Sequence, residues 1–186
     1  MSEVYKPSED TFLLAEVLKH EQLAEKDVLE IGCGSGFLTA VTAERGANVT
    51  AIDINSAAID ATKKLLVNRK LTAHVFLSDL FENVQGKFDL ILFNSPYLPE
   101  NEEDKLAGKD IRYSGGHTGR KVIEKFIVQS KKHLKIGGKI LLLISSLTDE
   151  RKVIEFFEGR GFICRPIANK KIEWEELLVL EALVHL

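Results

Sequence analysis

A planar amino group could be held by a short segment of the chain: Asn94, Ser95, Pro96 and Tyr97. An amide or adenine NH2 group is a poor nucleophile because its lone pair is delocalised, so a site that uses it must accept both N–H hydrogens. The side-chain oxygen of Asn94 and the backbone carbonyl of residue 95 could be these two acceptors. Pro96 would fix the turn, and Tyr97 could pack against the planar group. The alternative is an ordinary strand-ending turn, which Asn and Ser before Pro also favour.

A second segment combines an apolar strand with three alternate glycines: Gly32, Gly34 and Gly36. They leave a turn with few side chains, so a flat or anionic ligand can lie against its backbone; a plain strand-to-helix turn is the alternative. A dinucleotide fingerprint would need a glycine at position 37, which is Phe37. Glu30, just before the loop, would repel a diphosphate but suit an ammonium or sulfonium group. S-adenosylmethionine carries both of these groups.

Two acidic residues follow the next predicted strands. Asp53 lies near the spacing of about 20 residues at which an acid accepts hydrogen bonds from ribose hydroxyls. Asp79 could accept a hydrogen bond from an adenine amino group, and Leu80 could offer backbone groups and apolar surface to the ring edge. Either acid could instead be a simple turn residue. Their joint occurrence at successive strand ends predicts a nucleoside-like ligand.

Together these segments suggest a methyl-transfer site. Methyl transfer from a sulfonium is an in-line displacement, and it needs the nucleophile held about 3 Å from the methyl carbon with its lone pair along the S–C axis. Such a site needs hydrogen-bond acceptors and correct positioning, but no strong base.

The elements that must position these residues alternate between strands and helices. Apolar runs predict strands at 28–31, 49–53, 74–77, 88–93, 139–144, 162–167 and 176–184. A helix capped by Ser8 is expected to open the fold. Helical segments lie between most of the strands, one of them capped by Ser56, and Gly137 and Gly138 are expected to end another. This alternation predicts a parallel sheet, and the last two strands predict an antiparallel hairpin. The polar segment 98–118 is expected to be a functional loop or a lid over the site.

Composition narrows the class of protein. The 186 residues, 45% of them hydrophobic, suit one domain spanning 1–186, and a net charge of −3 gives no reason to expect direct nucleic-acid binding. Cys33 and Cys164 form no CxxC pair and the histidines show no ligand spacing, so neither a metal site nor a disulfide framework is expected. No apolar run reaches the roughly 20 residues needed to cross a bilayer. We therefore expect a soluble, cytoplasmic protein that does not bind membranes.

The chain resembles the class I S-adenosylmethionine-dependent methyltransferases, and within them the HemK-like protein-glutamine methyltransferases. The likeness covers nearly the whole chain and rests on segments 5–14, 30–36, 53–55, 79–80, 94–97 and 113–120. It is greatest to the short archaeal and eukaryotic branch, which lacks the N-terminal docking domain of bacterial relatives. The resemblance implies a Rossmann-like α/β fold: a seven-stranded, mostly parallel sheet with a C-terminal antiparallel hairpin and helices on both faces.

The resemblance also implies a reaction. A methyl group would pass from S-adenosylmethionine to the side-chain amide nitrogen of the glutamine in the Gly-Gly-Gln loop of a class I translation release factor. Asn94 and residue 95 would hold that amide, within a catalytic segment formed by Asn94, Ser95, Pro96 and Tyr97. The residues expected at the cofactor are Tyr5, Thr11, Glu30, Gly32, Gly34, Asp53, Ile54, Asp79, Leu80 and Asn94.

One position departs from the family pattern, because Ser95 stands where a proline is usual. The acceptor there is a main-chain carbonyl, which any residue supplies, so rigidity is affected more than chemistry. Members of this branch work with a small zinc-binding activator subunit. The segment Ala73–Leu77 is apolar and, in the family's sheet order, an unprotected edge to which a partner could add a strand. A strand buried by helices on both faces is the alternative.

Other functions remain compatible with the sequence. An Asn-x-Pro-Tyr segment also serves adenine-N6 DNA methyltransferases, although the net charge and the lack of a target-recognition domain argue against that acceptor. A lysine side chain is another candidate methyl acceptor. The chain could also be a non-catalytic S-adenosylmethionine-binding subunit, and an NAD-dependent dehydrogenase is the least favoured class because of Phe37.

Overall fold

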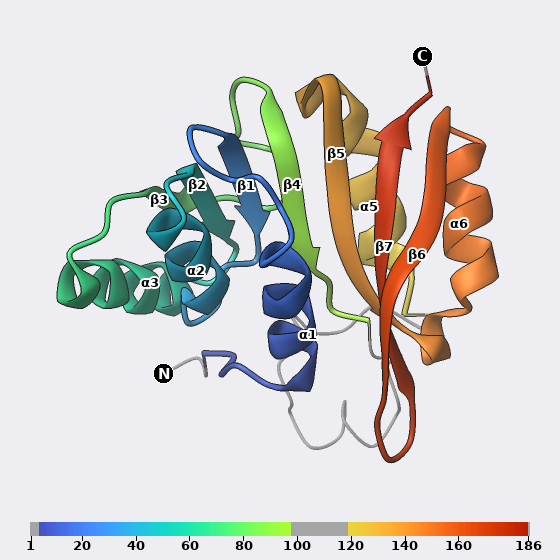
Figure 1. The fold of residues 1–186 in the computed structure, drawn as a ribbon, viewed down its shortest axis with the longest axis horizontal. Coiled ribbons are helices and arrows are strands. Elements are labelled where there is room, and N and C mark those ends of the chain that lie inside the picture. The colour runs from blue at the N-terminus through green and yellow to red at the C-terminus, as the bar shows by residue number, and fades with distance from the viewer. Residues whose placement is uncertain (1–3, 98–118, 186) are drawn as a thin grey trace.

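The computed structural model of the chain describes residues 4–97 and 119–185. Within them, the strands form one sheet in the order β3-β2-β1-β4-β5-β7-β6 (Figure 1). The strands are β1 (Asp27–Ile31), β2 (Asn48–Asp53), β3 (His74–Leu77), β4 (Phe88–Asn94), β5 (Leu134–Ser145), β6 (Phe162–Lys171) and β7 (Glu176–Val184). Neighbours among the first five run parallel, and β7 is antiparallel to both β5 and β6. The predicted α/β sheet with its C-terminal hairpin is confirmed.

Helices cover both faces of this sheet (Figure 1). They are α1 (Glu9–Leu18), α2 (Phe37–Glu44), α3 (Ser56–Arg69), α5 (Lys121–Ser130) and α6 (Glu150–Glu158), with short 3-10 turns η2 (Lys131–His133) and η3 (Ser146–Thr148). Alternate residues of β4 face opposite layers: Ile91 packs with buried residues of α5 and α6, whereas Leu90 packs with those of α1 and α2. Helix α3 packs on the same side as α1 and α2, against β2 and β3. The central strands β1 and β4 are therefore buried from two sides, as their continuous apolar runs indicate.

The centre of the sheet is where the chain changes direction. From β1 the sequence proceeds outward to β2 and β3, and from β4 it proceeds outward to β5 on the other side. The connections leaving β1 and β4 therefore separate, one to α2 and the other to α5, on opposite faces. In such sheets a crevice opens at the carboxyl ends of the two central strands. Ile31 and Phe93, adjacent in register, end the paired part of β1 and β4 at this crevice.

Two local boundaries differ from the sequence-based expectation. Helix α3 is capped by Asn55, whose side-chain oxygen accepts from the amide of Ala57 at 3.0 Å, and not by Ser56. Strand β5 begins at Leu134, so Gly137 and Gly138 lie within a strand and do not end a helix. Gly138 permits a close approach there, because a Cβ at that position would lie 2.8 Å from the carbonyl oxygen of Phe88.

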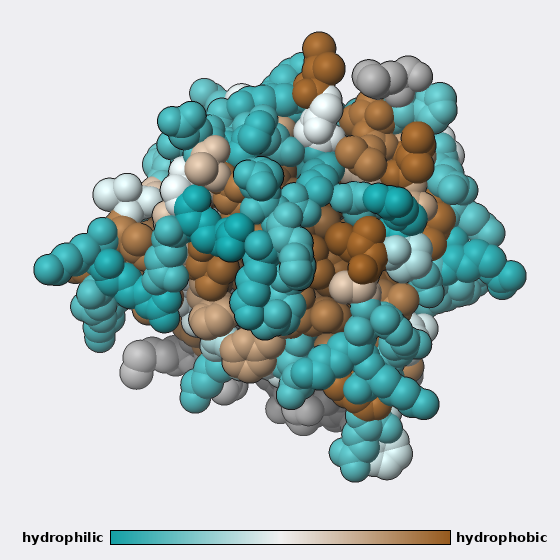
Figure 2. Space-filling model, viewed as in Figure 1, coloured by the Kyte–Doolittle hydropathy of each residue, from teal (hydrophilic) through white to brown (hydrophobic). Residues whose placement is uncertain are grey.

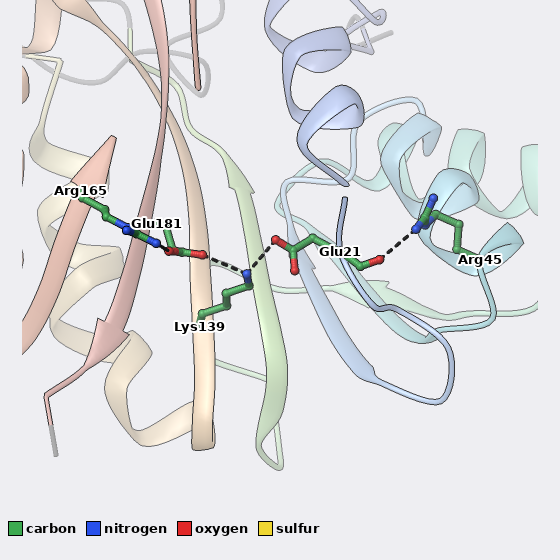
Figure 3. A network of polar contacts seen from close by, with 5 residues as sticks. All are labelled: Glu21, Arg45, Lys139, Arg165 and Glu181. Carbon is green, nitrogen blue, oxygen red and sulfur yellow. Dashed lines mark hydrogen bonds and ion pairs between the residues drawn. The ribbon is translucent and has the colours of Figure 1, made fainter. Parts of the chain in front are cut away.

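A polar network crosses the face of the sheet beside α1 (Figure 3). Arg165 on β6 contacts Glu181 on β7 at 2.9 Å, Glu181 contacts Lys139 on β5 at 2.9 Å, and Lys139 contacts Glu21 at 2.7 Å. Arg45 completes the network by donating to the Glu21 backbone carbonyl at 2.8 Å. Burial raises the pKa of Glu181, but its hydrogen bonds with Lys139 and Arg165 outweigh burial and lower it overall. Figure 2 shows hydrophilic side chains over much of this face, so charged groups lie over the part of the sheet that α1 leaves uncovered.

Strand β3 is at the edge of the sheet, as expected from the family's strand order. Val75 is buried and Phe76 is half-buried, whereas His74 and Leu77 at the two ends of the strand are exposed, Leu77 to 51%. Among the described residues, no helix is both long and apolar enough to span a bilayer.

We predict that Gly36→Ala destabilises the fold more than a glycine substitution in open space. Gly36 has φ of +83°, and an added Cβ would lie 2.9 Å from the Cα of Thr62 on α3. Strain and overlap together should lower the free energy of unfolding by about 2–4 kcal/mol in urea titrations. Gly137→Ala is the control, since Gly137 also has positive φ (+75°) but no heavy atom lies within 4 Å of its added Cβ. It should cost about 1 kcal/mol, and equal costs for the two variants would contradict the packing role of Gly36.

Candidate active site

A cavity of about 270 Å³ occupies the crevice at the carboxyl ends of the central strands. Pockets that bind small molecules have volumes of about 300–1,000 Å³. The volume of this cavity is therefore close to the lower end of that range. Most of the residues that the sequence singled out line it: Tyr5, Gly32, Gly34, Asp53, Ile54, Asp79, Leu80, Asn94, Ser95, Pro96 and Tyr97. Thr11 and Glu30 are the predicted residues that do not.

A larger hollow of about 560 Å³ lies at the opposite edge, near the amino ends of β1, β2 and β3. It contains none of the predicted site residues. Ligands of open α/β sheets bind at the carboxyl ends of the strands, where connecting loops converge. The smaller cavity is therefore the better candidate site.

The glycine loop is held in place by β2. The amides of Gly32 and Cys33 donate to the Ile52 carbonyl at 2.8 and 2.9 Å. Asp53 binds the loop through its side chain, with Oδ2 accepting from the Gly34 amide at 2.9 Å and Oδ1 accepting from the Asn55 amide at 2.8 Å. Asp53 is thus a turn residue and a cavity residue at once.

The turn after β3 holds an unusual backbone conformation. Leu80 has φ of +48°, which is costly for a residue with a branched side chain. Ser78 stabilises the turn by donating its hydroxyl hydrogen to the Leu80 carbonyl at 2.9 Å. Asp79 beside it accepts from the Lys125 ammonium at 2.8 Å, and its side chain is 39% exposed. The turn therefore presents both a carboxylate and a fixed backbone to the cavity.

Glu30 lies behind the cavity wall and is 3% exposed. It accepts a hydrogen bond from the Thr39 hydroxyl. Burial is the largest influence on Glu30, and its pKa is raised to about 8; the Thr39 bond opposes part of this rise, and nearby Asp53 adds a smaller one. At pH 7 the carboxyl is therefore mostly protonated in the unliganded protein. A carboxyl with a raised pKa carries less charge near neutral pH, so Glu30 would repel a diphosphate less than an exposed glutamate in the same place.

Asn94 ends β4 with an acceptor that has no partner. Its side-chain Oδ1 is buried and accepts no hydrogen bond from the described part of the chain. Buried polar atoms are nearly always paired, so an unpaired one in a cavity wall indicates a missing ligand. The next residue is fixed, since the Ser95 hydroxyl donates to the Leu143 carbonyl of β5 at 2.7 Å. This bond provides the rigidity that the family's usual proline would give.

Asp10 is a site residue that the sequence reasoning missed. It is 4% exposed, lines the cavity, and accepts from the hydroxyls of Tyr5 at 2.6 Å and Tyr97 at 3.4 Å. Burial is the main cause of a raised pKa at both tyrosines, and the Asp10 charge adds to it. Thr11 is turned toward Asp10, with its hydroxyl 3.1 Å from Oδ1. The only sequence signal was the position of Asp10 inside the segment 5–14.

Gly119, which the sequence reasoning did not single out, lies against the backbone of Tyr97. It has φ of +69°, and an added Cβ would lie 2.4 Å from the Tyr97 carbonyl oxygen. In the sequence, Gly119 is marked only by its position within the segment 113–120, which carries part of the family resemblance. Arg120 donates to the Thr148 carbonyl at 2.8 Å. The expected lid, Leu98–Thr118, lies outside the described residues. Over the part of the chain that is described, no cluster of His, Cys, Asp and Glu side chains could hold a metal ion.

The raised pKa of Glu30 predicts a pH-dependent stability. The folded state holds the Glu30 proton between about pH 4.5 and about pH 8, whereas the unfolded chain releases it at the lower value. Stability from this group is therefore complete below about pH 4.5 and is lost as pH rises toward 8. The glutamine of Glu30→Gln cannot titrate. As pH rises through this window, the free energy of unfolding of the natural chain should therefore fall relative to that of the variant. Parallel curves for the two proteins in urea titrations at pH 5, 6, 7 and 8 would refute the assignment.

Comparisons with known proteins agree with this geometry. The family model of the methyltransferase small domain matches residues 6–115. A Methanocaldococcus jannaschii protein, MJ0928, to which protein N5-glutamine methyltransferase activity is attributed, is 41% identical over 97% of this chain and 91% of its own length. The mouse methyltransferase HEMK2 is 29% identical over 91% of this chain and 87% of its own.

A solved structure shares the whole fold. The Mtq2–Trm112 complex of E. cuniculi, responsible for methylation of the eRF1 translation termination factor, includes a chain that aligns with a TM-score of 0.79 and 25% identity. The alignment covers 97% of this chain and 98% of that one. Together with the family match, it confirms the predicted Rossmann-like methyltransferase architecture. The chain therefore belongs to the methyltransferase small domain family, as a HemK-like class I methyltransferase that uses S-adenosylmethionine.

Proposed function

We propose that this enzyme methylates the side-chain amide nitrogen of the glutamine in the Gly-Gly-Gln loop of a class I translation release factor. The observation that carries the proposal is the buried, unpartnered Oδ1 of Asn94 at the wall of the cavity. A primary amide offers this oxygen an N–H hydrogen. The carbonyl of residue 95 supplies the second acceptor, and Tyr97 provides a ring beside them.

The donor side of the cavity fits a nucleoside attached to an amino acid. Gly32 and Gly34 keep side chains out of the loop, and both have positive φ values that a larger residue would hold only with strain. Asp53 lines the cavity with a carboxylate that could accept hydrogen bonds from ribose hydroxyls, and the turn at Asp79 and Leu80 offers a carboxylate and backbone groups to adenine. S-adenosylmethionine, when bound, supplies a methyl group on a positively charged sulfur. Glu30 would then regain its charge, because a nearby cation lowers the pKa of a carboxyl.

The acceptor side of the cavity would stabilise the positive charge that develops on the amide nitrogen, and no base would need to remove a proton before methyl transfer. Positive charge develops on the amide nitrogen as it becomes methylated, which strengthens its N–H hydrogen bonds to Asn94 Oδ1 and the residue 95 carbonyl. Acceptors fixed before the reaction therefore stabilise the transition state more than the ground state. The Ser95 bond to Leu143 keeps the second acceptor from rotating away.

Two relatives support the choice of acceptor. Glutamine N5-methylation is attributed to the M. jannaschii relative, and the aligned E. cuniculi complex methylates a termination factor. The direct test is transfer of radiolabelled methyl to a recombinant class I release factor, beside a variant whose loop glutamine is changed to alanine. Label lost with that glutamine supports the proposal, and label that survives the change points to another acceptor, such as lysine.

Asn94→Ala is predicted to lower kcat by roughly 10² or more, because it removes an acceptor that the transition state needs. The melting temperature should stay the same or rise, since the variant also removes an unpaired buried oxygen. Single-turnover methylation and thermal unfolding measure the two effects. Near-normal turnover of Asn94→Ala would contradict the mechanism.

Ser95→Pro is the matched control at the next position. It loses the hydroxyl bond to Leu143 but gains a ring that restricts the same turn, and it keeps the backbone carbonyl. Turnover should stay within several-fold of the natural enzyme. A loss as large as that of Asn94→Ala would show that general disorder of the turn, and not the lost acceptor, explains both.

We further propose that a small zinc-binding activator adds a strand to the exposed edge β3, at Ala73–Leu77. Support comes from the half-exposed strand and from the presence of Trm112 in the aligned complex. Coexpression with such a partner should raise the yield of soluble protein and slow amide hydrogen exchange in β3. Unchanged exchange in β3 within a stable complex would place the partner elsewhere.

A further inference from the structure

One buried carboxylate contacts both sides of the cavity. The two oxygens of Asp10 have separate partners. Oδ1 accepts from the amide and hydroxyl of Thr11, at 2.5 and 3.1 Å, which fixes the start of α1. Oδ2 accepts from the hydroxyls of Tyr5, at 2.6 Å, and Tyr97, at 3.4 Å. Oδ2 therefore binds side chains that line the cavity, whereas Oδ1 binds groups at the start of α1.

The two tyrosines come from opposite sides of the site. Tyr5 belongs to the segment before α1 and lies against the glycine loop: an added Cβ on Gly34 would be 3.4 Å from the Tyr5 carbonyl oxygen and 3.7 Å from its Cβ. Tyr97 follows Asn94 by three residues and lies on the acceptor side. Both line the cavity. Asp10 Oδ2 thus connects Tyr5, which lies against the glycine loop, with Tyr97, which lies beside the proposed methyl-acceptor site.

We propose that Asp10 is a positioning residue that couples donor binding to the ordering of the acceptor site, by orienting Tyr5 and Tyr97 through one shared oxygen. The acceptor half of this inference rests on the proposed function, whereas the donor half does not. Asp10 touches neither reacting atom, so it acts only through the two rings.

The two hydrogen bonds differ in a way that suggests an order of events. The Tyr5 bond is short, as expected for a hydroxyl donating to a carboxylate, whereas the Tyr97 bond is long. Catalytic hydrogen bonds are often long before the substrate complex forms and tighten within it. The Tyr5 bond therefore holds the segment over the donor loop first, and the Tyr97 bond tightens when a planar amide packs against the ring.

A second carboxylate, Glu175, lies close enough to both rings to raise their pKa values, although burial is the larger cause. Its Oε2 is buried and receives no hydrogen bond from any described residue. Ser8 also forms a hydrogen bond with the Tyr5 side chain. Asp10 is the group that both hydroxyls contact, so it can orient the two rings together.

Double-mutant cycles test the coupling, because residues that act through one atom give non-additive effects. The donor half uses the Kd of S-adenosylmethionine, measured by calorimetry without any acceptor. We expect Asp10→Asn and Tyr5→Phe each to weaken binding about three- to tenfold, and the double variant to bind no more weakly than the weaker single variant. Tyr97→Phe should leave this Kd within about twofold.

The acceptor half uses kcat/KM for the release factor at saturating S-adenosylmethionine. Tyr97→Phe and Asp10→Asn are each expected to lower it about tenfold, and the double variant should match Asp10→Asn alone. Effects that multiply to about a hundredfold would overturn the proposal, as would an Asp10→Asn enzyme with unchanged Kd and kcat/KM.

Glu9→Gln is the matched control for charge at the start of α1. Glu9 is the preceding residue, and it forms a surface ion pair with Lys170 away from the cavity. It should shift the melting temperature slightly and leave both readouts unchanged. A Glu9→Gln variant with the same kinetic losses as Asp10→Asn would mean that helix charge, and not the tyrosines, causes them. If the natural enzyme failed to methylate the release factor, the proposed function would fail while the donor cycle could still be read.

Discussion

The parallel register between β1 and β4 is the constraint on which the site depends. Ile31 pairs with Phe93, so the glycine loop and Asn94 leave the sheet side by side. Side chains alternate along a strand, so a slip of one residue would turn Asn94 to the other face and exchange the side chains that β4 packs into the two apolar layers. Burial of both faces of β4 therefore fixes the register, and the register fixes the acceptor beside the donor loop.

The site concentrates polar groups that the fold alone would not favour. Glu30 is buried with a raised pKa, Asn94 keeps an unpaired oxygen, and Leu80 holds a strained backbone. Each of these lowers stability in the unliganded protein. Their stabilisation comes from the apolar layers on both faces, and a bound ligand would satisfy what the chain leaves unpaired. Groups of this kind distinguish a reactive crevice from an inert one.

Local patterns predicted the strands well, because apolar runs need burial whatever surrounds them. The same local patterns predicted the ends of helices and strands less well. Ser56 and Asn55 are both good capping residues, and only the path of the chain from β2 selects Asn55. Gly137 and Gly138 look like a helix end, but the close approach to Phe88 places them within β5. Ser95 gives no sign in the sequence that its hydroxyl would reach Leu143, 48 residues away.

The sequence by itself determined the order of strands and helices, the glycine loop, and the acids and amide at strand ends, because these follow from residue type and short-range spacing. The tertiary structure decided which of them face the cavity, and it brought in Asp10 and Gly119, whose importance depends on contacts with Tyr97 across the fold. It also decided that Glu30 is mostly neutral, since a pKa depends on burial and neighbouring charge. The type of chemistry could be predicted from the residues, but the geometry of the site and the charge state of its side chains depend on the folded chain.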